Sequence, residues 1–282
     1  MDSQRRSKLT ATVIVAAVVV AVALIAALIM AVVDGDDDSA GESATPPSSG
    51  PAEPPATATT DEDAESTDVD LIGRRVTLVD APGGTPREQT GQPGAFPEGQ
   101  EMVGPPAGLE LQRVSSGATV MVSRSDGPTD LDGEVMTGYA HSPGGAALVA
   151  ANFAGLGMEM GAAYADFLQQ FMPDAVAEDP AVLDEIRSRG ASADGRALTA
   201  AQGYQAPRWF RFQHCDEQVC TVEAAMPSIA EAVGEIESID VGPHDHQVVR
   251  VSMEWTGEQW EILSSRAMPP VVEIDGTWSP WT

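Results

Sequence analysis

One helix-start signal constrains this chain more than any other sequence feature. Ser142 is a good N-cap residue, and Pro143 suits the first helical position because its missing N–H is not needed there. Beyond them, large apolar side chains recur at spacings of three and four residues, which predicts a long amphipathic helix. They are Val149, Phe153, Leu156, Met160, Tyr164, Phe167 and Phe171. Gly155, Gly157 and Gly161 weaken its middle, so we expect a kink or a break there.

The flanking segments predict further elements. A second helix should begin after Asp179 as N-cap and end at Gly190. Alternating apolar and polar residues predict β-hairpins over residues 109–122, 207–225 and 247–263. In the last hairpin the alternation indicates one core face and one solvated face. Helices followed by antiparallel strands imply an α+β fold, with the helices packed on one curved antiparallel sheet.

The N-terminal region predicts a membrane anchor. Residues 9–33, which run from Leu9 to Val33, contain no charged residue. At about 1.5 Å per residue such a helix crosses a hydrocarbon core of about 30 Å. Basic residues lie within segment 1–8 and acidic residues follow the apolar run. The positive-inside rule therefore places the N-terminus in the cytoplasm and the rest of the chain outside. A cleaved signal peptide is the alternative, although its apolar region is usually shorter.

Residues 34–107 are rich in proline, glycine and acidic residues, with few large apolar side chains. Such a segment buries too little apolar surface to offset its ordering entropy, and its prolines and like charges favour extended conformations. We therefore expect a disordered tether, with one short strand within residues 69–79. The folded extracytoplasmic domain is then predicted to span residues 108–282.

The charge balance excludes one class of partner. The chain has 15 lysines and arginines against 43 aspartates and glutamates, for a net charge of -28. Nucleic acid binding needs clustered basic residues that neutralise phosphates. We therefore expect no direct contact with nucleic acid.

Two cysteines, Cys215 and Cys220, are close in the sequence and flank a predicted turn. Two thiolates are too few for a zinc site, and the adjacent His214 adds only a third ligand with poor geometry. In an extracytoplasmic domain we expect a disulfide across this hairpin instead.

No motif in the chain predicts a reaction. His141 precedes the helix cap, but no serine, cysteine or acid is paired with it by spacing, so a structural histidine is the simpler interpretation. Ser142 belongs to no nucleophile-elbow motif. His244 and His246 lie in one polar loop with too few ligands for a metal. We predict no catalytic, cofactor-binding or metal-binding residue and no cofactor.

The stretch from residue 138 to 151 reads Gly-Tyr-Ala-His-Ser-Pro-Gly-Gly-Ala-Ala-Leu-Val-Ala-Ala. Together with the tether, the helix pair and the tryptophan-ended strands, it resembles an uncharacterised actinobacterial membrane-anchored family. In that family a Gly-aromatic-Ala-His-(Ser/Thr)-Pro-x-Gly-Ala motif begins a long helix. The family is similar to the cystatin-like, nuclear-transport-factor-like cone of single-pass assembly factors in conjugation and type IV secretion, including TcpC-type proteins.

The resemblance implies a non-enzymatic envelope protein whose external domain binds other envelope proteins in a conjugation or secretion complex. We expect the concave sheet face and the tryptophan-bearing end to form the contacts, with His141, Trp255, Trp278 and Trp281 as candidate interaction or pocket residues. A small-ligand or enzymatic use of the cone's cavity is an alternative. A β-sandwich module is another, and it requires residues 146–172 not to be helical. Assembly of the chain into homo-oligomers is also compatible with this sequence.

Overall fold

The structure is a computed structural model of the chain, and it belongs to the α+β class, as the sequence predicted. It describes residues 65–70, 72–97, 102–159, 161–190, 206–227, 246–271 and 273–282. The predicted anchor at residues 9–33 and the first part of the tether lie outside these residues. Within the described ranges, no helix combines the length and the apolar character that crossing a membrane requires.

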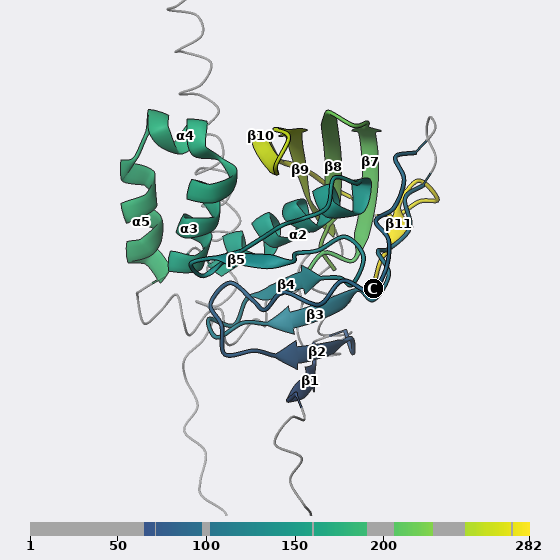
Figure 1. The fold of residues 1–282 in the computed structure, drawn as a ribbon, viewed down its shortest axis with the longest axis horizontal. Coiled ribbons are helices and arrows are strands. Elements are labelled where there is room, and N and C mark those ends of the chain that lie inside the picture. The colour runs from purple at the N-terminus through teal and green to yellow at the C-terminus, as the bar shows by residue number, and fades with distance from the viewer. Residues whose placement is uncertain are drawn as a thin grey trace, which may run out of the picture.

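Two sheets lie on either side of the helix α2 (Pro143–Glu159) (Figure 1). The antiparallel five-stranded sheet has the order β10 (Trp260–Val271), β9 (His246–Trp255), β8 (Val219–Ala225), β7 (Trp209–Cys215) and β11 (Ser279–Pro280). The four-stranded sheet has the order β1 (Thr67–Val69), β2 (Arg75–Leu78), β3 (Glu110–Arg113) and β4 (Thr119–Val122), with β2 parallel to β3. The other elements are the hairpin strands β5 (Asp130–Asp132) and β6 (Val135–Thr137) and the helices α3 (Ala162–Phe171), α4 (Pro173–Glu178) and α5 (Ala181–Gly190).

The folded unit begins earlier than residue 108, where the sequence alone placed its start. β2 pairs with β3, and its Val76 is fully buried. Residues 79–97, which we call the strap, continue from β2 and are held through their backbone. The Gln112 side chain accepts from the Thr85 N–H at 2.8 Å and donates to the Thr85 carbonyl at 2.9 Å. Composition does not reveal such backbone contacts, so the strap resembled a tether in the sequence.

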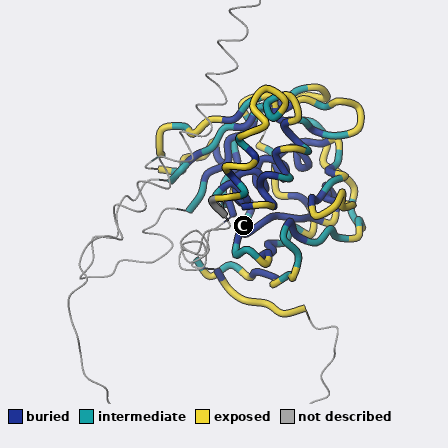
Figure 2. The backbone as a smooth tube through the Cα atoms, turned by 90° about the vertical axis from the view of Figure 1, so that its left-hand side faces the viewer, coloured by how far each residue is buried: buried dark blue, intermediate teal, exposed yellow. Residues whose placement is uncertain are grey.

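The helix α2 differs from the amphipathic helix that the sequence predicted. Every side chain from Pro143 to Gly157 is buried, since α2 contacts β8 and β9 on one side and β4 on another. Figure 2 shows that the buried residues of the chain, in dark blue, gather in the interior of the described part. A helix that is apolar all round belongs in a core. A break at Gly161 separates α2 from α3, where the glycines predicted one, and these helices rule out the β-sandwich alternative.

Asn152 joins α2 to the edge of the four-stranded sheet. Its side-chain oxygen accepts from the Met121 N–H at 2.7 Å, and its side-chain nitrogen donates to the Met121 carbonyl at 3.0 Å. The same nitrogen donates to the Tyr139 hydroxyl at 2.8 Å. Because β4 is the edge strand beside α2, this amide bonds the backbone groups that a further strand would otherwise bond.

The N-terminus of α2 is fixed by a buried carboxylate. Ser142 is the N-cap, as predicted, because its Oγ accepts from the Gly145 N–H at 3.0 Å. The same hydroxyl donates to Asp126 at 2.5 Å, and Ser125 donates to the other carboxylate oxygen at 2.5 Å. The Gly94 N–H of the strap also donates to Asp126, at 3.2 Å. A negative charge beside a helix N-terminus is favourable, so Asp126 connects the strap, the loop after β4 and α2.

Replacing Asn152 with leucine should lower the free energy of unfolding by about 3 kcal/mol or more. Leucine is similar in size and favours a helix, but it leaves the N–H and C=O of Met121 buried without partners, at about 1–3 kcal/mol each. Urea denaturation measures the change. Ser188→Ala, on an exposed part of α5, is the control and should change stability by less than about 0.5 kcal/mol. Unchanged stability of Asn152→Leu would refute this bridging role.

Gly155 sets how closely α2 approaches β4. A Cβ added there would lie 2.3 Å from the Thr119 carbonyl oxygen, which is too close. In an isolated helix glycine to alanine gains about 1 kcal/mol, but here α2 or β4 must shift. We expect Gly155→Ala to destabilise the fold by about 1–3 kcal/mol in a thermal melt. Gly276→Ala, where a Cβ meets nothing within 4 Å, should be neutral. A stabilised Gly155→Ala would contradict this contact.

Candidate functional site

His141 lies at the end of the five-stranded sheet, one residue before the N-cap of α2. Its Nε2 is 2.5 Å from the carbonyl oxygen of Glu217, which lies in the turn between β7 and β8. Because a carbonyl oxygen only accepts, Nε2 carries the hydrogen and donates it. His141 is nevertheless an exposed residue, so its ring is oriented by the main chain and still reaches solvent.

Trp255, the last residue of β9, stacks on His141. The ring centroids are 4.4 Å apart and the planes differ by 14°. Phe96 from the strap packs against the imidazole in an edge-to-face arrangement, with 5.3 Å between the ring centroids. The centroid of the Trp260 ring lies 5.4 Å from that of Trp255. The Trp260 indole donates to the Ala140 carbonyl at 3.0 Å. We call Phe96, His141, Trp255 and Trp260 the aromatic cluster, and it unites two of the residues that the sequence singled out.

A disulfide lies beside the aromatic cluster. Cys215 and Cys220 are direct partners in the pairing of β7 with β8, their Cα atoms are 4.0 Å apart, and they form a disulfide in the structure. The intervening turn is closed by Asp216, whose carboxylate accepts from the backbone N–H groups of Val219 and Gln218 at 2.8 Å each. These bonds hold the pKa of Asp216 below its ordinary value. The turn that receives His141 is therefore fixed.

Trp278 and Trp281 do not join the aromatic cluster and do not form an open surface. β11 pairs with β7 between them, and both tryptophans are buried. Trp281 packs on Phe210 at 4.2 Å between ring centroids, and its indole donates to the Val103 carbonyl at 3.2 Å. Trp278 lies under the guanidinium of Arg211 at 4.3 Å. The expectation that these residues provide contacts to partners is corrected, because they cover an edge of their own sheet.

The face of the five-stranded sheet that points away from α2 carries ion pairs that the sequence did not single out. Glu223 of β8 is buried between Arg211 of β7 and Arg250 of β9. The Nε atoms of both arginines donate to its carboxylate at 2.7 Å. Burial alone raises the pKa of Glu223, but hydrogen bonds from Arg250 and Arg211 outweigh it and hold the pKa below its ordinary value. The pairing register of the strands places these three residues next to one another. The alternation of polar residues along each strand was the one sequence feature that could have indicated this shared face.

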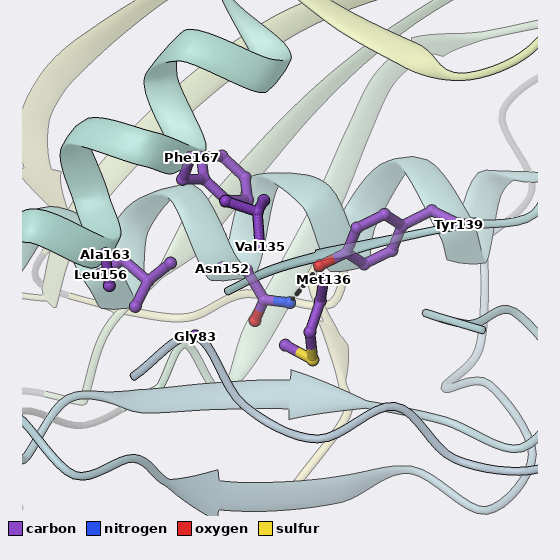
Figure 3. Close-up of a pocket in the computed structure, with 8 residues that line it drawn as sticks. All are labelled: Gly83, Val135, Met136, Tyr139, Asn152, Leu156, Ala163 and Phe167. Carbon is purple, nitrogen blue, oxygen red and sulfur yellow. Dashed lines mark hydrogen bonds between the residues drawn. The ribbon is translucent and has the colours of Figure 1, made fainter. Parts of the chain in front are cut away.

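A crevice lies in the interior of the described part, but it has no room for a ligand. The crevice lies between α2, α3, β6 and the strap (Figure 3). It is lined by Gly83, Val135, Met136, Tyr139, Asn152, Leu156, Ala163 and Phe167. These side chains fill it so completely that no water molecule fits, and burial raises the pKa of Tyr139. Neither His141 nor a carboxylate lines this crevice, so it lacks the features that the cavity alternative requires.

The sequence singled out few candidate metal ligands, and His246 is one of those that the structure describes. Among the described residues, no three histidine, cysteine or acidic side chains gather as a metal site would require. The His246 Nδ1 donates to the Met226 carbonyl oxygen at 3.1 Å, and the ring packs edge-on against Trp209. A carbonyl accepts, so the His246 Nδ1 carries the hydrogen. His244 lies outside the described residues.

The α+β domain that carries these sites is shared with other proteins. The chain belongs to the family described as Domain of unknown function (DUF8175), whose model matches residues 77–278. The match begins in β2 and ends at Trp278, so it contains α2, the aromatic cluster and the Glu223 ion pairs. No curated protein and no solved structure matches the chain.

The Glu223 ion pairs predict a specific pH dependence. A carboxyl whose pKa is lowered on folding stabilises the fold above its unfolded pKa, and the contribution is lost as the pH falls through the folded pKa. Glu223→Gln should cost about 2 kcal/mol or more at pH 7 and much less near pH 3. Urea denaturation at both pH values measures this. Glu254→Gln, which changes an exposed acid on the same face, should show little cost at either pH. An equal cost for Glu223→Gln at both would contradict the assignment.

Proposed function

We propose that the chain is a non-enzymatic, single-pass protein of the cell envelope whose external domain binds partner proteins in a conjugation or secretion complex. Residues 1–8 lie in the cytoplasm, residues 9–33 cross the membrane, and the α+β domain lies outside. The uncharged run and the change from basic to acidic residues across it support this orientation. The Cys215–Cys220 disulfide suits an oxidising compartment.

We further infer that α2, α3 and the five-stranded sheet form a cystatin-like or nuclear-transport-factor-like cone. The order of elements supports this inference, because the long helix comes first and β7 to β10 follow as neighbours that each pair with the next. The inner face of that sheet packs on α2. The four-stranded sheet is an addition on the other side of α2 (Figure 1).

The aromatic cluster is the observation that carries the protein-binding proposal. His141 is exposed and Trp255 is half-buried, yet both rings are held in place by stacking, by the Glu217 carbonyl and by the nearby disulfide. Aromatic residues are enriched at protein interfaces, because a rigid aromatic side chain buries a large area at a low cost in conformational entropy. A fixed, accessible pair of rings at the end of a sheet suits such a contact.

Affinity purification from membranes tests the proposal. A tagged full-length chain, solubilised in mild detergent, should recover components of a conjugation or secretion machine, identified by mass spectrometry. Trp255→Ala should lower that recovery severalfold, because it removes the ring that stacks on His141. Leu131→Ala, which changes an exposed apolar residue of β5, is the matched control and should leave recovery unchanged. Circular dichroism verifies that both variants are folded.

The proposal has a clear contrary result. If purification recovers no such component and a deletion strain transfers DNA or secretes protein normally, the chain does not belong to such a complex. If partners are recovered equally by the Trp255→Ala variant, the aromatic cluster is not the contact.

A further inference from the structure

One row of residues across the outer face of the five-stranded sheet concentrates positive charge in a strongly acidic chain. Val222 and Val251 belong to the core that contains α2, so their strand neighbours Glu223 and Arg250 point the other way. The pairing register aligns Arg211 with Glu223, Glu223 with Arg250, and Arg250 with Arg266 of β10. We call Arg211, Glu223, Arg250 and Arg266 the arginine row. Three arginines against one glutamate leave the row positive.

The hydrogen-bond donors of the row are not used equally. Arg211 bonds Glu223 and Thr277 and lies over the Trp278 ring. Arg250 donates to Glu223 through Nε and one terminal nitrogen, and among the described residues its other terminal nitrogen has no hydrogen-bond partner. Arg266 is exposed, and within the described part of the chain its guanidinium forms no hydrogen bond or ion pair. The open donors therefore lie side by side on β9 and β10.

The juxtaposition of Arg250 and Arg266 is unfavourable without an anion. Like charges directly opposite each other on neighbouring strands destabilise a sheet, and Glu223 already serves two guanidiniums. A carboxylate placed at Arg250 and Arg266 would remove the repulsion and accept from both. Arginine matches a carboxylate especially well, because its planar fork donates two parallel hydrogen bonds.

The neighbours of the row indicate what else the ligand carries. On one side lie hydroxyl groups, since Ser264 pairs with Ser252 and the Ser252 hydroxyl is 3.0 Å from that of Thr221. On the other side Met268 pairs with Val248 in a small apolar cluster. Carboxylates flanked by apolar side chains therefore fit this surface.

We propose that the arginine row binds an acidic peptide segment of a partner protein, with a carboxylate on Arg250 and Arg266 and an apolar side chain against Met268. This rests on the proposed protein-binding function and adds the face and the chemistry. An anionic membrane fits less well, because Glu254 and Glu261 lie further along the same face and would repel an extended negative surface. A short peptide segment contacts the row without meeting those acids.

Fluorescence anisotropy with the purified full-length chain in neutral detergent tests the proposal. The probe is a short dye-labelled peptide that alternates aspartate with leucine, and its control peptide has asparagine in place of aspartate. Arg266→Gln should weaken binding of the acidic probe about tenfold, which is the loss of one charge-assisted contact. Arg75→Gln, an exposed arginine on β2, removes the same charge elsewhere and should change binding less than twofold. Added salt should weaken binding of the acidic peptide.

Several results would overturn the proposal. One is an acidic peptide that does not bind, or that binds no better than its asparagine control. Another is equal loss of binding in Arg266→Gln and Arg75→Gln, which would indicate general charge attraction. A third is Arg266-dependent binding of inorganic phosphate or of anionic phospholipid vesicles without binding of the peptide. Recovery of membrane partners by the Arg266→Gln chain separates these failures from failure of the proposed function.

Discussion

The hydrogen bonds between the Asn152 amide and the Met121 backbone are the interaction on which both halves of this domain depend. Between Pro143 and Met158 the helix α2 has no charged residue, and Asn152 is its only polar side chain. A fully buried polar group must find partners, and an edge strand must have its backbone groups satisfied. One amide meets both requirements. The four-stranded sheet therefore ends against a helix, while the five-stranded sheet packs on another side of that helix.

At two other places a buried carboxylate links separate segments through hydrogen bonds, as the Asn152 amide does. Asp126 accepts from the N-cap Ser142 and from the strap, so one charge connects three segments at the start of α2. Glu223 is shared by Arg211 and Arg250 across three strands. In an acidic chain most carboxylates remain solvated, and these two are stabilised because donors surround them. Burial thus makes a common residue type into a structural link.

Local features of the fold could be predicted from sequence, whereas contacts between distant segments could not. The cap at Ser142, the break at Gly161 and the hairpins follow from residue types at short spacing. The apolar stripe indicated a helix but did not indicate how completely α2 is buried. The alanines and glycines on the remaining sides of α2 are also buried, because the four-stranded sheet packs there. The strap was interpreted as tether because glutamine-to-backbone bonds have no compositional signal. His141 and Trp255 were each singled out, but only the fold brings them together.

Amide hydrogen exchange at Met121, measured by NMR on the native protein, tests most directly whether Asn152 holds α2 to the edge of β4. An edge-strand N–H that faces a side-chain acceptor inside the core should exchange only when the domain opens globally. The account predicts that the Met121 amide exchanges as slowly as the most protected amides of β8 and β9. Exchange of the Met121 amide at a rate close to that of an unstructured peptide, while β8 and β9 remain protected, would contradict it.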